Sequence, residues 1–161
     1  MKIGLVGLRD ARLARRFACS GVHVFACGAD DLLGDARIVL LPSAVAVAQA
    51  LAAPRVVWLD LADGFATELA IQDVWPECAP GDVVVDAGGG TPEDAKRRAA
   101  SLASAQLHFV DCHVDAGGLL TFGGSEDAMR LVAPYADHAG HWTHRGPCGS
   151  GYHARLDSRN K

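Results

Sequence analysis

The chain begins with Met1–Gly7, MKIGLVG, a short apolar strand that ends on a glycine. A glycine at this point is the first of three in the G-x-G-x-x-G turn, which places a dinucleotide pyrophosphate at a helix N-terminus. The next five residues, Leu8 to Arg12, read LRDAR, so side chains stand where the other two glycines are expected. Those glycines let the backbone approach the pyrophosphate and let the helix pack on the strand. The opening therefore predicts a dinucleotide-type fold with an altered phosphate loop.

The rest of the chain alternates strand-like and helix-like stretches. Short apolar runs predict strands at 2–6, 22–27, 37–41, 55–61, 82–86, 108–112, 121–124 and 141–144. Helical patterns are expected at 11–20, 44–53, 67–74, 92–103 and 126–136, with Ser43, Thr91 and Ser125 as capping or opening residues. Strands that alternate with helices at this spacing form a mostly parallel sheet with helices on both faces. We expect one Rossmann-like α/β domain over residues 1–161.

Composition excludes several classes of partner. Half of the 161 residues are hydrophobic, the net charge is -4, and the pI is near 5.9. A nucleic-acid partner is not expected, because a phosphate footprint needs clustered Lys and Arg over a basic face. The apolar runs are only strand-length, so no membrane span is expected. Five widely spaced cysteines without a CxxC pair, and no signal peptide, favour a reducing cytoplasm.

Several stretches together resemble a known family. They follow its order and approximate spacing over nearly the whole chain: MKIGLVGL (1–8), PRVVWL (54–59), PGDVVVDAGG (80–89), HFVDC (108–112), Gly117-Gly118 and GPCGSG (146–151). The chain resembles the N-terminal domain of 6-phosphogluconate dehydrogenases, especially the bacterial NAD-type branch, and more loosely the β-hydroxyacid dehydrogenases. The resemblance implies an NAD(P)-binding domain and, for the family, oxidative decarboxylation of a phosphosugar acid.

The resemblance also places the cofactor. The positions that would face NAD or NADP are Gly7, Leu8, Arg9, Asp10, Arg12, Gly28, Leu61, Ala62, Gly88 and Gly89. The acidic residue that holds the adenosine ribose in the family is replaced by 27–29, Cys-Gly-Ala, with Asp30 and Asp31 as shifted substitutes. The family's Gly-Asn-Ser step becomes three glycines, 88–90. We therefore expect NAD or NADP to bind weakly or not at all.

The catalytic positions of the family also differ. The lysine that acts as general base corresponds to Arg155, and a guanidinium stays protonated at neutral pH and cannot take a proton. The Ser-Gly-Gly substrate loop becomes 115–118, and its Asp115 would repel an anionic sugar phosphate. A repurposed enzyme would use Cys112, His113 or Asp115 at the carboxyl end of a strand. Cys112 is either a nucleophile or a buried structural cysteine.

Other features allow two interpretations. Arg9 and Arg12 either bind phosphate in place of the lost backbone contacts or belong to a solvated helix face. The glycines 88–90 either admit a ligand, next to a helix whose first N–H groups could hold an anion, or form a relaxed turn. Asp60 and Asp63 are either exposed or mark a repurposed pocket. No metal is expected at His138, His141, His144 and Cys148, because their spacing across a helix-to-strand turn does not converge.

Two functions follow. The first is a degenerate stand-alone domain without the ancestral chemistry, which binds a partner or a small molecule in the old cofactor cleft. The alternative is a small NAD(P)-dependent oxidoreductase or repurposed enzyme at the carboxyl ends of the strands. The family continues past the position of Lys161 into an all-helical domain, and the polar residues 155–161 lead us to expect a natural end here.

Such an end would leave apolar surface that the helical domain covers in the family, so we expect a homodimer or an obligate protein partner. Light scattering of the purified chain should therefore give the mass of a dimer or a larger assembly. A clean monomer at micromolar concentration would count against this expectation.

Overall fold

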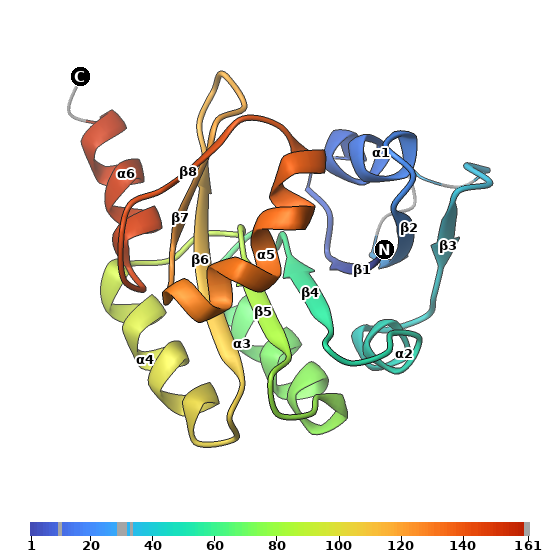
Figure 1. The fold of residues 1–161 in the computed structure, drawn as a ribbon, viewed down its shortest axis with the longest axis horizontal. Helices are drawn as coiled ribbons and strands as arrows, with labels where there is room; N and C mark the ends of the chain where they lie inside the picture. Colours follow the sequence, from blue (N-terminus) through green and yellow to red (C-terminus); the bar gives the residue numbers. More distant parts are fainter. Residues whose placement is uncertain (10, 29–31, 33, 160–161) are drawn as a thin grey trace.

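The computed structural model describes residues 1–9, 11–28, 32 and 34–159, and the side chains among these as far as Arg155. These residues form one eight-stranded sheet in the order β3-β2-β1-β4-β5-β6-β7-β8 (Figure 1). The strands are β1 (Lys2–Val6), β2 (His23–Cys27), β3 (Ile38–Leu40), β4 (Val56–Leu59), β5 (Val83–Asp86), β6 (His108–Val114), β7 (Leu120–Gly123) and β8 (Trp142–His144). The helices are α1 (Ala11–Cys19), α2 (Ala44–Gln49), α3 (Gly64–Val74), α4 (Pro92–Ala103), α5 (Glu126–Ala139) and α6 (Ser150–Arg159), with a 3₁₀ turn at Trp75–Glu77.

The sheet confirms the predicted Rossmann-like α/β fold. Strands β1 to β6 are parallel, β7 runs antiparallel to β6, and β8 is parallel to β7. The strand order reverses between β1 and β4, which is the switch point where such sheets bind ligands. In register, Val6 pairs with Leu59 and Leu59 with Asp86. The carboxyl ends of β1, β4 and β5 therefore lie side by side at one edge.

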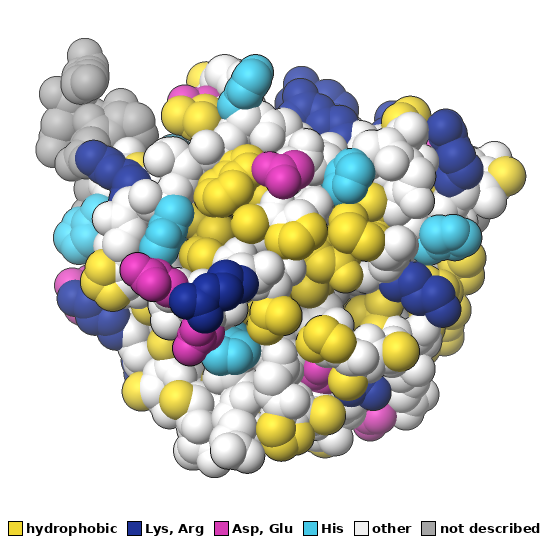
Figure 2. Space-filling model, in the orientation of Figure 1, with side chains coloured by type: hydrophobic (Ala, Val, Ile, Leu, Met, Phe, Trp, Pro, Cys, Tyr) yellow, Lys and Arg dark blue, Asp and Glu magenta, His cyan; other side chains and the backbone are white. Residues whose placement is uncertain are grey.

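Each face of the sheet has its own core. On the face of α1 and α5, Trp58 packs edge-on against Phe17 and Phe122, with ring centroids 5.8 Å apart in both pairs. The opposite face is covered by α2, α3, α4 and α6 and buries neighbours such as Val57 and Leu59, because successive strand residues point to opposite sides. Hydrophobic side chains also gather near the centre of the α5 face in Figure 2.

Buried aspartates tie the elements near the carboxyl edge together. Asp111 of β6 accepts hydrogen bonds from the backbone N–H groups of Gly149 (2.6 Å) and Tyr152 (2.8 Å), at the start of α6. Asp86 of β5 accepts from Arg98 Nη1 of α4 (2.8 Å) and from the Gly88 N–H (2.9 Å). Burial raises the pKa of both carboxyls, and these donors oppose that shift. The network fixes α4 and α6 against the sheet.

Several predicted boundaries are wrong, for local reasons. The helix expected at 44–53 ends at Gln49. The helix expected from 67 begins at Gly64, because the Asp63 side chain accepts the Ala66 N–H (2.8 Å) and caps it. The strand expected to end at Cys112 continues to Val114, which pairs with Leu120 across a hairpin. Across the described part of the chain, no helix is long and apolar enough to cross a membrane.

The Asp111 contacts generate a test of the fold. In Asp111→Asn one carboxylate oxygen becomes an N–H₂ group, so one of the two backbone N–H donors loses its acceptor. We expect a loss of about 1–2 kcal/mol in the free energy of unfolding and a fall of about 3–6 °C in Tm. Asp127→Asn, on the exposed side of α5, is the control and should change Tm little. Equal Tm values for the two variants would contradict the anchoring role of Asp111.

Candidate functional site

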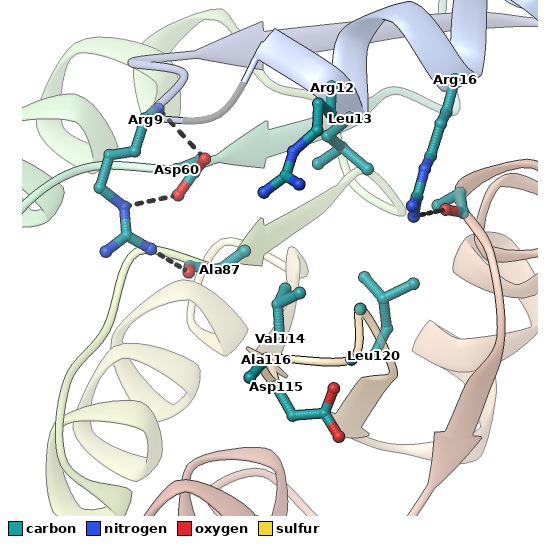
Figure 3. Close-up of a pocket in the computed structure, with 13 residues that line it drawn as sticks. Arg9, Arg12, Leu13, Arg16, Asp60, Ala87, Val114, Asp115, Ala116 and Leu120 are labelled. Carbon is teal, nitrogen blue, oxygen red and sulfur yellow. Dashed lines mark hydrogen bonds and ion pairs between the residues drawn. The ribbon is translucent and has the colours of Figure 1, made fainter.

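The carboxyl edge at the switch point is crossed by one side chain. Arg9 follows β1, and its Nε donates to Asp60 Oδ1 at 2.7 Å while its backbone N–H donates to Oδ2 at 3.2 Å. Its Nη2 donates to the Ala87 carbonyl at 3.0 Å. Asp60 follows β4 and Ala87 follows β5, so this Arg9 bridge joins the ends of three strands (Figure 3).

The bridge bears on the alternatives that the sequence left open for Arg9 and for Asp60. Arg9 precedes α1 and forms an ion pair, so it is not part of a solvated helix face, although its side chain is 48% exposed. Asp60 is only 6% exposed and lies in the cleft, whereas Asp63 caps α3. A dinucleotide in a fold of this type lies across the same strand ends. The guanidinium therefore occupies part of the path that a cofactor would follow.

The first turn keeps its leading glycine. Gly7 has a φ of +71°, and its N–H donates to the Cys27 carbonyl at 3.0 Å. A Cβ on Gly7 would lie 1.9 Å from Leu61 Cδ2, so the partly buried Leu61 fills the space beside the turn. Gly28 lies against Gly7, and Leu8 packs on the core of the α1 face. Asp10, Asp30 and Asp31, named above for cofactor binding, lie outside the described residues.

The glycines after β5 are covered by the protein itself. A Cβ on Gly88 would lie 2.5 Å from the Leu61 carbonyl oxygen. A Cβ on Gly89, which has a φ of +128°, would lie 2.5 Å from Arg155 Nη1. Arg155 of α6 thus lies over Gly89, and the close approach that these glycines permit is made by Leu61 and Arg155. Arg155 and Ala62 also line a separate open hollow of about 390 Å³ next to the start of α4.

Helix α4 offers no simple anion site at its start. The Thr91 hydroxyl accepts the Asp94 N–H at 3.1 Å, and Asp94 Oδ2 accepts the Thr91 N–H at 3.1 Å. This reciprocal capping box occupies the Asp94 N–H, one of the N-terminal donors that an anion would use. An anion at this helix start would therefore compete with the Thr91 side chain.

His113 and Arg155 share a second hollow. They line a space of about 190 Å³ above Gly88 and Gly89, with Arg9 at its side; we call it the glycine hollow. Burial, and then the Arg155 guanidinium, lower the pKa of His113, while Asp115 opposes the shift. The imidazole is therefore neutral at pH 7. The glycine hollow brings together three of the four residues predicted for catalysis, Arg155, His113 and Cys112.

Cys112, although it borders the glycine hollow, and Asp115 both have structural surroundings. Cys112 is 1% exposed, and burial raises the pKa of its thiol well above the ordinary value. A nucleophilic cysteine needs a thiolate, so Cys112 fits the structural alternative. The Asp115 carboxylate accepts the Leu119 N–H at 2.9 Å in the hairpin between β6 and β7, and it points away from the arginines in Figure 3.

The histidines near the end of the chain brace a loop. His144 Nε2 lies 2.9 Å from the Gly124 carbonyl and 2.8 Å from that of Gly146. Within the described ranges, no group of three or more His, Cys, Asp or Glu side chains is placed to hold a metal ion.

A hollow of about 360 Å³ beside the Arg9 bridge lies between α1 and the β6–β7 hairpin. We call it the arginine pocket (Figure 3). It is lined by Arg9, Arg12, Leu13, Arg16, Asp60, Ala87, 114–118, Leu120 and Ala139. Sequence reasoning named Arg9 and Arg12 but missed Arg16. The four-residue spacing of Arg12 and Arg16, which places both on one helix face, is the signal that points to it.

The sheet order and the Gly7 turn define an α/β domain of the dinucleotide-binding class. The chain belongs to the family described as the NAD binding domain of 6-phosphogluconate dehydrogenase, whose model matches residues 2–146. It is 27% identical to the NADP⁺-dependent, decarboxylating 6-phosphogluconate dehydrogenase of Bacillus subtilis, over 96% of this chain and 38% of that protein. A decarboxylating 6-phosphogluconate dehydrogenase of Staphylococcus aureus is 30% identical over 64% of this chain and 25% of its own length. The chain thus spans well under half of these relatives.

Solved structures share the fold. A putative oxidoreductase from Mycobacterium avium matches with a TM-score of 0.86 and 21% identity, over 98% of this chain and 61% of that one. An imine reductase from Myxococcus stipitatus in complex with NADP⁺ matches with a TM-score of 0.85 and 16% identity, over 99% and 59%. The 3-hydroxyisobutyrate dehydrogenase of Mycobacterium tuberculosis gives 0.83 and 23%, over 98% and 58%.

The cysteine environments predict an order of alkylation. Cys19 is exposed, whereas burial raises the thiol pKa of Cys78 to about 11 and raises the thiol pKa of Cys112 well above its ordinary value. Iodoacetamide at neutral pH should therefore modify Cys19 first and Cys112 only when the protein unfolds, as read by peptide mass mapping. Cys19→Ser should remove the fast-labelled site. Labelling of native Cys112 as fast as Cys19 would restore the nucleophile hypothesis.

Proposed function

We propose that this domain keeps the NAD(P)-binding fold without the oxidative decarboxylation of its relatives, and that it binds a small molecule in the old cofactor cleft. The observation that carries the proposal is the Arg9 bridge across β1, β4 and β5. In folds of this type a dinucleotide lies across the ends of these strands, and here an ion pair of the protein occupies part of that place.

A dinucleotide would have to displace the bridge. Arg9 donates three hydrogen bonds, two of them to a carboxylate. Hydrogen bonds to charged groups contribute about 1.5–3 kcal/mol each, and the 48% exposure of the Arg9 side chain lowers this contribution. A net loss of about 3–4 kcal/mol in binding weakens an affinity several hundredfold. New contacts between Arg9 and the pyrophosphate would offset part of this loss, but the backbone contacts of a glycine loop are absent.

The residues that the resemblance assigns to the family's reaction are also different in this chain. Arg155 cannot accept the proton that leaves a substrate hydroxyl during hydride transfer. Gly88 and Gly89 present no side chain toward a nicotinamide or a substrate. These features support a binding role.

One observation favours a second candidate function, a repurposed enzyme. The neutral imidazole of His113 lines the glycine hollow beside Arg155, so it can accept a proton while the guanidinium stabilises a developing negative charge. A His113→Gln variant would separate this candidate from a pure binding role. If the protein is an enzyme, the variant should lose turnover of any substrate that is identified. Binding in the arginine pocket should stay intact.

Titration with NAD, NADH, NADP and NADPH, followed by calorimetry and thermal shift, tests the proposal. We expect no binding below millimolar concentration. The double variant Arg9→Gly with Asp60→Asn removes the bridge without leaving a buried unpaired charge. It should bind these dinucleotides at least about tenfold more tightly than the unmodified protein does. Arg37→Gln, in an exposed ion pair with Asp35, is the control.

Micromolar binding of any of the four dinucleotides by the unmodified protein would overturn the proposal. It would show that Arg9 leaves Asp60 and takes over the role of the glycine loop.

A further inference from the structure

Two hollows in one half of the old cofactor cleft meet at a single side chain. A dinucleotide-binding sheet has two halves, and the half that follows the switch point, here β4, β5 and β6, receives the second nucleoside of a dinucleotide. The glycine hollow lies over this half. Beside it lies the hollow next to the start of α4, which we call the α4 hollow and which is lined by 62–64, 88–93 and Arg155. Both hollows are lined by Gly88, Gly89 and Arg155, so Arg155 lies between them.

Arg155 is fixed on the glycine turn by the helix that carries it. Tyr152, three residues earlier, lies on the same face of α6, and its backbone N–H donates to Asp111 at 2.8 Å. A Cβ on Gly90 would lie 3.1 Å from Cε2 of the Tyr152 ring. A Cβ on Gly89 would lie 2.5 Å from Arg155 Nη1, so the guanidinium occupies the space above that glycine. The anchoring of α6 thus places the Arg155 side chain against the floor that the two hollows share.

The pKa of His113 is consistent with this position of the guanidinium. Burial is the main cause that lowers the pKa of the imidazole, the Arg155 guanidinium lowers it further, and Asp115 opposes the shift. Arg9, which also lines the glycine hollow, is paired with Asp60. Arg155 therefore brings both volume and positive charge to the boundary of the glycine hollow.

The two hollows are small as long as they are separate. The glycine hollow has a volume of about 190 Å³, which is below the range of about 300–1,000 Å³ for small-molecule sites. The α4 hollow, with about 390 Å³, lies near the lower end of that range. A nucleoside laid across this half of the sheet would extend over both hollows and would meet the Arg155 guanidinium between them. A single ring or a shorter group fits on one side of this side chain.

We propose that Arg155 divides the second half of the old cofactor cleft, so that this half excludes a nucleoside and admits only a compact ligand about the size of one ring. The proposal rests on the proposed function, because it takes the small-molecule role of the cleft as given and names the residue that limits the size of the ligand. The limit is separate from the Arg9 bridge, since Arg9 crosses the ends of β1, β4 and β5 whereas Arg155 lies over Gly89.

Reduced nicotinamide riboside, a nucleoside without phosphate, and nicotinamide, its ring alone, are the probes, and NMR titration measures their affinities. Arg155→Ala joins the two hollows and should bind the riboside at least about tenfold more tightly than the unmodified protein does. The affinity for nicotinamide should be the same in both proteins. The double variant Arg9→Gly with Asp60→Asn should not gain affinity for the riboside. Arg130→Gln, an exposed arginine of α5, is the matched control and should bind both probes as the unmodified protein does.

The position of Arg155 can be tested without a ligand. The pKa of His113, followed by NMR, should rise in Arg155→Ala, because a neighbouring positive charge is removed. It should also rise in Arg155→Met, which keeps the stem of the side chain without its charge, and Arg130→Gln should leave it unchanged. Circular dichroism and Tm establish that each variant is folded.

Three outcomes would overturn the proposal: an unchanged His113 pKa in the folded Arg155 variants, equal affinity of Arg155→Ala and Arg130→Gln for the riboside, or micromolar binding of the riboside by the unmodified protein. The proposed function fails separately, if the unmodified protein binds NADPH at micromolar concentration through its adenosine half while binding of the riboside still requires the removal of Arg155.

Discussion

The ion pair between Arg9 and Asp60 is the contact on which the carboxyl edge of this domain depends. It joins residues 51 positions apart and, through the Ala87 carbonyl, fixes three strand ends at the switch point of the sheet. The adjoining side chains follow from it. Leu61, next to Asp60, fills the space beside Gly7 and lies against Gly88, and Arg155 covers Gly89. Side chains of the protein thus fill part of the edge where folds of this type bind a dinucleotide.

A similar pattern recurs at three positions where the resemblance places contacts to a ligand. An arginine at the phosphate loop bonds to Asp60, and an arginine at the lysine position lies over Gly89. An aspartate in the substrate loop caps its own hairpin at Leu119. Contacts that relatives offer to a ligand are made internally, and this agreement between separate sites is the main support for a changed function. The arginine pocket and the glycine hollow are parts of this edge that remain open beside the bridge.

The fold could be predicted from the sequence, because it depends on local signals. Alternating strands and helices, and Gly7 as the leading glycine of the turn, are readable within a few residues of each other. The arrangement of the site could not be predicted in the same way, because its contacts are long-range. The pairing of Arg9 with Asp60 and the anchoring of α6 by Asp111 each join distant segments. The extension of β6 to Val114 depends on its pairing with β7, and no local sequence pattern predicts this pairing. The burial of Cys112 likewise depends on what packs over the strand.

The most direct test of this account is the NMR signal of the Arg9 Nε–H group in ¹⁵N-labelled protein, assigned with Arg9→Lys. A guanidinium held by Asp60 should give a resolved signal whose exchange with water is slowed, and Asp60→Asn should move or remove it. Millimolar NADP⁺ should leave it unchanged. A signal that ignores Asp60→Asn, or that shifts when micromolar NADPH is added, would contradict the claim that Arg9 closes the cofactor cleft.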